Sequence, residues 1–366
     1  MYQYVKTYTE NGAGYIILNN PKKLNALSQP MAAELSEVLE QFRFDPSIRV
    51  IVLRGEGGKF CAGGDITSMK KRVDCYAAGI PAPTQTKTNM ANFNHLVLYI
   101  RQIEKPVVAW IEGACAGGGM SLAMACDFAI AEENTKMSFA FSSIGLAPDM
   151  GSSVLLTRRV GPARAADLFM TGRRFTGKEA ADMGIITRAV PAEELEENVK
   201  KQITALANGP TLSYAEIKGG INRIMYPDLH QCMNLEADYV DRLTHSTDHA
   251  EAVNAFLEKR KPVFTGTLFH TFAGSFYIHA ACGMYGMLWG FHFTFLCILN
   301  LRLQIETCGD HNSCEACHND RQYQRQDKVV YVSLSVGQLG CRQHSDDTCT
   351  VWQCIQTDGR HCNQSV

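Results

Sequence analysis

The stretch ACAGGGMSLAMACD, residues 114–127, places three consecutive glycines directly before a helix-forming run. Glycine inside a regular element costs about 0.5–1 kcal/mol relative to alanine, so three in a row indicate a close approach of the backbone to another group. An apolar run ending at Ile111 predicts a strand, and a helix is expected to begin near Gly118. First-turn amides lack intrahelical partners and carry the positive end of the helix dipole. The pattern therefore predicts a site for an oxygen that gains negative charge.

A second stretch, GKFCAGGDI at residues 58–66, shows the same order of a strand end, small residues and a helix start. Two separate backbone donors of this kind can hold one carbonyl oxygen between them. Each stretch alone is as consistent with a tight turn as with a ligand site. Neither matches GxxxxGK[ST] or GxGxxG, so the sequence does not predict a nucleotide site.

Strands and helices alternate along the first part of the chain. The stretches YQYVKTY (residues 2–8) and GYIILN (residues 14–19) are typical of strands and flank an Asn-Gly pair, which predicts a hairpin. Apolar residues at helical spacing follow Ser28, a residue type that caps helices. This alternation predicts an α/β core over residues 1–190, and the later periodicity predicts a helical region over residues 191–266.

Taken in order, five motifs closely resemble those of the crotonase, or enoyl-CoA hydratase/isomerase, superfamily over about residues 3–266. They are NNPKKLNALS, FCAGGDI, KPVVAWIEGACAGGGMSLAMACDFAIA, GLAPDMGSS and AFLEKRKPVFTG. The resemblance implies a spiral of ββα units, a C-terminal helical trimerisation region and assembly as a trimer or hexamer. It also implies an acyl-CoA substrate, with no cofactor beyond the coenzyme A of that substrate and no metal. By position, the amides of Gly64 and Gly118 would hold the thioester oxygen.

The residues at the acid/base positions of this family narrow the choice of reaction. Hydratases of this family carry two glutamates, and the matching positions here are Ser121 and Phe141, which can neither activate water nor move the α-proton. Asp149, in GLAPD, resembles the acid of the enoyl-CoA isomerases of phenylacetate-type degradation. Apolar neighbours would raise its pKa toward the working range. We therefore expect an isomerase that shifts the double bond of a 3-enoyl-CoA, or carries out a related cis–trans or ring isomerisation.

Several alternatives stay open from the sequence. Asp149 precedes a helical run and is also a good helix cap. Within the fold, the alternatives are a hydratase, another lyase or hydrolase, and a dehalogenase-like enzyme with Asp149 as nucleophile. A non-catalytic acyl-CoA-binding or RNA-binding homologue is a further class. Residues 1–266 hold 29 Lys and Arg and 29 Asp and Glu, so charge gives no support to nucleic-acid binding.

The resemblance also places residues at the coenzyme A and acyl subsites. Asp65 is expected to be structural within the GGD turn, and Lys259 is equally consistent with a solvated side chain. Cys61 and Cys115 are expected to be small buried fillers. The full set expected to contact substrate is Ala26, Ala62, Gly64, Asp65, Ile66, Gly118, Phe141, Phe256 and Lys259.

The last hundred residues, 267–366, differ in composition from the rest. They contain nine of the 14 cysteines and seven of the 11 histidines, and residues 267–301 have no Asp, Glu, Lys or Arg. We expect a poorly ordered or non-native extension, from a frameshift, stop-codon read-through or annotation error. A membrane anchor at 267–301 is the second interpretation. The CEACH motif (Cys314, Cys317, His318) matches a haem-attachment pattern and half a zinc site.

The beginning of the chain lacks a basic segment followed by an apolar run, so no signal peptide is expected. The formal net charge of −2 gives no reason to expect binding to nucleic acids or membranes through bulk charge. We expect a cytoplasmic enzyme.

Overall fold

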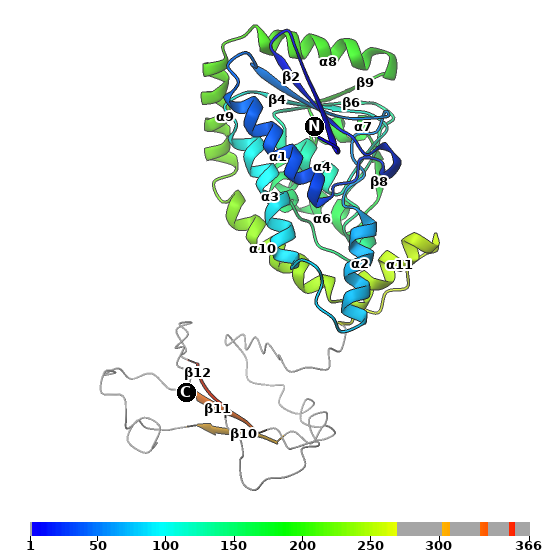
Figure 1. Ribbon diagram of the computed structural model, residues 1–366, viewed down its shortest axis with the longest axis vertical. Helices are drawn as coiled ribbons and strands as arrows, with labels where there is room; N and C mark the ends of the chain where they lie inside the picture. Colours follow the sequence, from blue (N-terminus) through cyan, green and yellow to red (C-terminus); the bar gives the residue numbers. More distant parts are fainter. Residues whose placement is uncertain (1, 269–301, 308–329, 336–350, 356–366) are drawn as a thin grey trace, which may run out of the picture. The chain divides into compact units, whose positions relative to one another are not determined.

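The computed structural model describes residues 2–268, 302–307, 330–335 and 351–355, which fall into two units that are described separately (Figure 1). The first unit contains a six-stranded sheet in the order β1-β2-β3-β4-β6-β9. Its first two strands are antiparallel and the others are parallel. The strands are β1 (Val5–Glu10), β2 (Ala13–Leu18), β3 (Val50–Gly55), β4 (Val107–Ile111), β6 (Phe128–Glu132) and β9 (Arg188–Val190).

Helices cover both faces of this sheet because successive side chains of its strands point to opposite sides. Tyr15, Val52 and Val108 lie in register and pack under one helix. Their neighbours Ile16 and Leu53 face the larger core on the other side. Figure 1 shows helix α8 (Ala192–Ala207) above the sheet. Helices α1 (Gln29–Phe44) and α3 (Thr86–Gln102) lie below it.

A second, three-stranded sheet gives the fold its repeating character. It consists of β5 (Ala114–Ala116), β7 (Lys136–Ser138) and β8 (Arg174–Thr176). Isolated bridges between Leu27 and Gly64 and between Cys61 and Cys115 join further turns of the chain to this layer. The chain passes alternately through the large sheet and this small layer. The predicted α/β core is confirmed.

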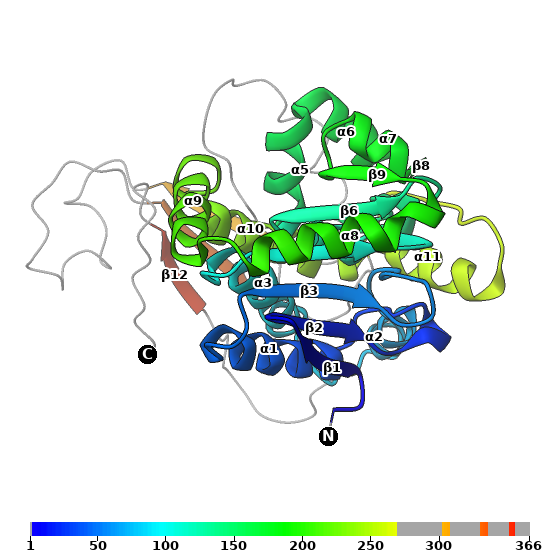
Figure 2. The same ribbon diagram turned by 90° about the horizontal axis from the view of Figure 1, so that it is seen from above.

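Eight further helices complete the first unit. They are α2 (Ile66–Ala77), α4 (Gly118–Ala125), α5 (Ser152–Val160), α6 (Pro162–Thr171), α7 (Gly177–Asp182), α9 (Thr211–Met225), α10 (Leu229–Thr244) and α11 (Thr247–Glu258). The helical C-terminal part that the sequence predicts is present. Figure 2 shows α8 lying along the strands of the sheet. The predicted boundary at residue 190 therefore separates the sheet from a helix that packs on it. The role of residues 191–266 in trimer formation stays a prediction.

Gly117 and Gly119, two of the three consecutive glycines, have separate structural roles. Cys61 donates its N–H to the Ala114 carbonyl (3.1 Å), and its own carbonyl accepts from the Ala116 N–H (2.9 Å). Gly117 then has a positive φ of 47°, which turns the chain into α4. A Cβ at Gly119 would lie 2.3 Å from the Cys61 carbonyl oxygen. Glycine therefore lets α4 begin directly against the Cys61 loop.

The described residues of the second unit form three strands of an antiparallel sheet, β10 (Arg302–Thr307), β11 (Val330–Ser335) and β12 (Val351–Ile355). The proposed anchor at 267–301 lies almost wholly outside the described residues, as does the CEACH motif. The interpretation of the extension therefore stays a prediction, as does the cytoplasmic location. Within the described ranges, no helix is long and apolar enough to cross a membrane.

The close contact at Gly119 gives a stability prediction. Gly119→Ala should lower the free energy of unfolding by about 1–3 kcal/mol, because the new methyl group meets a backbone oxygen. Gly219→Ala in α9 is the matched control, because a Cβ there meets nothing within 4 Å, and it should stabilise the protein by up to about 1 kcal/mol. Urea unfolding measures both. Equal effects of the two substitutions would contradict the packing role of Gly119.

Candidate active site

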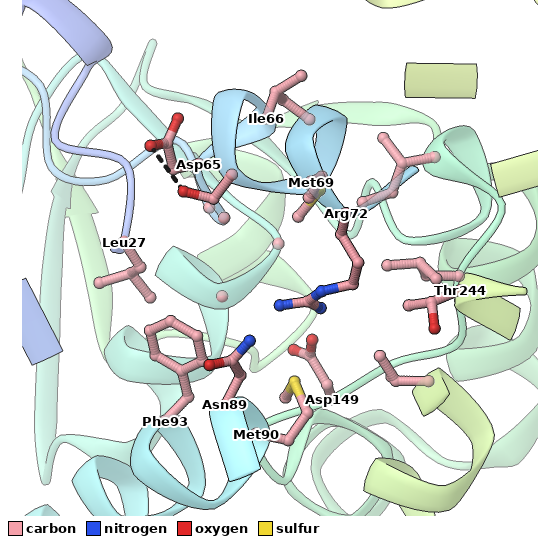
Figure 3. Close-up of a pocket in the computed structure, with 18 of the residues that line it drawn as sticks. Leu27, Asp65, Ile66, Met69, Arg72, Asn89, Met90, Phe93, Asp149 and Thr244 are labelled. Carbon is pink, nitrogen blue, oxygen red and sulfur yellow. Dashed lines mark hydrogen bonds between the residues drawn. The ribbon is translucent and has the colours of Figure 1, made fainter. Parts of the chain in front are cut away.

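A cavity of about 420 Å³ lies between the loops of the spiral and helices α2, α3, α10 and α11 (Figure 3). Both glycine motifs reach it, through residues 62–64 and 117–118. Much of the remaining wall is apolar and includes Leu27, Met69, Met90, Phe93, Phe141, Ile144, Leu146, Met150 and Val240. Such a site excludes water and strengthens the electrostatic interactions of any polar group inside it.

Two backbone donors face this cavity. Gly118 is the first residue of α4, and Gly64 immediately precedes the N-cap residue of α2. Within the described residues, neither amide donates a hydrogen bond to another protein group. The pairing of Cys61 with β5 brings their two loops side by side. Both donors thus belong to one cavity, and their joint binding of a developing oxyanion stays a prediction from the sequence motifs.

Asp149 lies in the same cavity on the loop before α5 (Figure 3). Its Oδ1 atom is fully buried and has no hydrogen-bond partner within the described residues. Burial, assisted by the negative charge of Glu236, raises the pKa of Asp149 to about 8. A carboxyl group of this kind can both accept and return a proton near neutral pH.

The structure shows that the alternative role of Asp149 as a helix cap is wrong. Helix α5 begins at Ser152, and its N-cap residue is Gly151. Its amides are capped by the buried Glu236 of α10, which accepts from Gly151 N–H (2.7 Å) and Ser153 N–H (2.8 Å). Among the described residues, the Asp149 side chain is thus left without a structural hydrogen bond.

Asp65, the other carboxylate that lines the cavity, has the opposite environment. It caps α2 by accepting from Thr67 N–H (3.0 Å) and forms an ion pair with Lys23 (2.9 Å). Burial opposes ionisation, but the hydrogen bonds from Lys23 and Thr67 keep the pKa of Asp65 below its usual value. This side chain supports the turn, as the sequence predicted.

The positions of the two hydratase glutamates hold groups without acid/base capacity. Ser121 is fully buried and bonds to Ser152 Oγ (2.6 Å), away from the cavity lining. Phe141 lines the cavity and packs against Phe169. The usual pair of carboxylates is therefore absent from these positions.

Comparison with known proteins identifies the relationship. A model of the enoyl-CoA hydratase/isomerase family matches residues 8–267. The chain belongs to the enoyl-CoA hydratase/isomerase family. A 1,2-epoxyphenylacetyl-CoA isomerase of Escherichia coli (strain K12) is 36% identical over 266 residues, which cover 73% of this chain and 100% of that protein.

Two further similar proteins are named for different reactions. A trans-2-decenoyl-[acyl-carrier-protein] isomerase of Streptococcus mutans is 32% identical over 70% of this chain and 96% of that protein. The crystal structure of an enoyl-CoA hydratase from Mycobacterium avium subsp. paratuberculosis K-10 matches with a TM-score of 0.64 at 31% identity, covering 72% of this chain and 99% of that one. The protein is therefore an enzyme of the crotonase fold, and the family implies an acyl-CoA substrate.

The family motifs come together largely as expected. Two residues of the expected set lie outside the cavity lining: Ala26 is buried beside it, and Lys259 is exposed in a left-handed conformation after α11. Their assignment to coenzyme A stays a prediction. Cys61 and Cys115 are fully buried, and burial raises the pKa of both thiols. The remaining expected residues all line the cavity: Ala62, Gly64, Asp65, Ile66, Gly118, Phe141, Asp149 and Phe256.

Sequence reasoning missed three polar residues at the site. Arg72 and His249 line the cavity, and Glu236 holds the start of α5. Arg72 follows Ile66 and Met69 at intervals of three, which places all three on one side of α2. This spacing could have indicated from the sequence that Arg72 lies at the site. His249 and Glu236 reach the site only through tertiary packing.

The raised pKa of Asp149 predicts how stability depends on pH. Between pH about 4 and about 8 the folded state holds a proton that the unfolded chain has lost, so this group contributes stability that declines as pH rises. Asp149→Asn should therefore become more stable relative to the parent across this window, by at most about 1.4 kcal/mol per pH unit. Urea unfolding at several pH values tests this. A constant difference between the two proteins would contradict the environment described for Asp149.

Proposed function

We propose that the protein is an acyl-CoA isomerase that converts a 3-enoyl-CoA into the conjugated 2-enoyl-CoA. The observation that carries the proposal is the unpartnered carboxyl group of Asp149 in a cavity that also holds the amides of Gly64 and Gly118. The absence of glutamate at positions 121 and 141 supports isomerisation over hydration. Two of the relatives described above are also named as isomerases.

The proposed reaction needs one base and one oxyanion site. The Asp149 carboxylate removes a proton from C2 of the substrate, and the electron pair delocalises into the thioester to form a dienolate. The Gly64 and Gly118 amides donate hydrogen bonds to its oxygen. The protonated Asp149 then returns the proton at C4, which places the double bond between C2 and C3. Atoms and charge balance without water or a cofactor.

The test compares Asp149→Asn with the parent, using the full chain and a 3-enoyl-CoA. The variant should lose activity by about 10²–10⁴-fold, because it removes the base, while binding of coenzyme A stays unchanged. Formation of the conjugated thioester is followed by ultraviolet absorbance, and binding by calorimetry. Asp167→Asn is the matched control: this exposed carboxylate of α6 lies outside the cavity lining, and the variant should retain activity within a few-fold.

Equal activity of Asp149→Asn and the parent would remove Asp149 from the mechanism. Inactivity of the parent, with binding of coenzyme A intact, would overturn the proposed isomerisation. The same assay run with a 2-enoyl-CoA would then report hydration as loss of the conjugated absorbance.

We further propose that the protein self-associates through α9 and α10. Both helices expose large apolar side chains that monomeric proteins seldom collect in one region. Ile221 and Ile224 are 47% and 79% exposed within the single chain. The other exposed apolar residues of these helices are Leu212, Ile217, Met225, Leu235 and Tyr239.

Sedimentation should find the parent as a trimer or hexamer. The double variant Ile221→Glu/Ile224→Glu should sediment as a smaller species, because burial of two charges opposes association. Met170→Glu is the control, since this residue of α6 is equally exposed (79%) but lies outside the proposed surface. A monomeric parent, or dissociation by the control alone, would contradict the proposed interface.

A further inference from the structure

Arg72 is a cation on the wall of the cavity that the proposed mechanism does not use. It lies on α2, where Ile66, Met69 and Arg72 all contribute to the lining. Figure 3 shows its guanidinium group extending from the helix into the cavity. The surrounding wall includes the apolar side chains of Met90 and Val240.

No protein group neutralises this charge at short range. Among the described residues, no carboxylate lies within 4.0 Å of Arg72 and none of its N–H groups has a hydrogen-bond partner. Asp241 and the Tyr76 hydroxyl act on it only at longer range, while burial lowers the pKa of Arg72. By contrast, Asp65, which lines the same cavity, is already paired with Lys23.

His249, a titratable residue that also lines the cavity, does not supply the missing negative charge. Its Nδ1 lies 2.7 Å from the Ile144 carbonyl oxygen, which can only accept, so Nδ1 carries the proton. Burial lowers the pKa of His249, and the positive charge of Arg72 adds to this effect. A neutral imidazole beside an unpaired guanidinium leaves room for an anionic ligand.

We propose that Arg72 binds a carboxylate at the far end of the acyl group, so that the preferred substrates are coenzyme A thioesters of unsaturated dicarboxylic acids. This inference rests on the proposed function for the position of the thioester. A carboxylate matches the planar fork of the guanidinium with two parallel hydrogen bonds. A carboxylate also carries the negative charge that a neutral chain end or a hydroxyl group lacks. That charge matters because an unpaired cation in a largely apolar wall costs free energy.

The test compares matched substrates that differ only at the chain end. For the parent, kcat/KM should be higher for a 3-enedioyl-CoA than for the 3-enoyl-CoA of the same length. Arg72→Met should reduce this ratio by about 10- to 100-fold, because a partly buried charge pair is lost. Arg72→Lys should retain part of the preference, since it keeps the charge without the fork.

Lys71→Met is the matched control. Lys71 is the exposed neighbouring cation that also lines the cavity, and its loss should change kcat/KM for both substrates by the same factor. An equal loss for both substrates in Arg72→Met would instead assign Arg72 to a phosphate of coenzyme A and overturn the inference. An unchanged ratio in Arg72→Met, or a parent that prefers the neutral chain, would also overturn it.

A binding measurement separates this inference from the proposed function. Calorimetry with the saturated thioesters of adipic, suberic and sebacic acids, each against its monocarboxylic counterpart, requires no turnover. The parent should bind at least one diacid thioester more tightly, and Arg72→Met should lose that preference. If the preference is found without isomerase activity, only the proposed reaction fails. If isomerisation occurs without any preference, only the inference about Arg72 fails.

Discussion

The backbone pairing of Cys61 with β5 is the contact on which the rest of the site depends. Its two hydrogen bonds hold the loop that contains Gly64 against the strand that leads into Gly118. One amide alone would be an ordinary helix terminus, whereas two fixed amides that line one cavity are the donor pair of the proposed oxyanion site. Because both belong to a paired backbone, they need little reorganisation when negative charge develops between them. The missing side chain at Gly119 makes this close approach possible.

The carboxyl groups near this donor pair differ in role because their environments differ. Glu236 and Asp65 each cap a helix, and their oxygens accept hydrogen bonds from backbone amides. Asp149, by contrast, has a buried oxygen without a partner among the described residues. An unpaired buried acid costs stability, and such local costs are typical of functional sites. The Glu236 cap removes the need for Asp149 to support α5, which leaves its carboxyl group available for proton transfer.

The two sides of the cavity come from different parts of the chain. The glycine loops and Asp149 belong to the spiral of strands and helices, while Val240, Thr244 and His249 come from the C-terminal helices α10 and α11. Arg72 of α2 also lines this cavity. In the proposed mechanism the spiral supplies the reactive groups. The later helices, together with α2, contribute much of the remaining wall of the cavity.

The sequence by itself determined the α/β core, the two glycine motifs and Asp149 as the candidate base. These features are local: glycine runs, strand ends and helical periodicity act over a few residues, and the family motifs keep their spacing. Only the tertiary structure decided that Glu236 caps α5 and that His249 shares the cavity with Asp149. These residues lie far apart in the chain, and no local pattern encodes which helices pack together. The pKa of Asp149 likewise depends on burial by distant segments, because desolvation is a property of the folded environment and not of the residue.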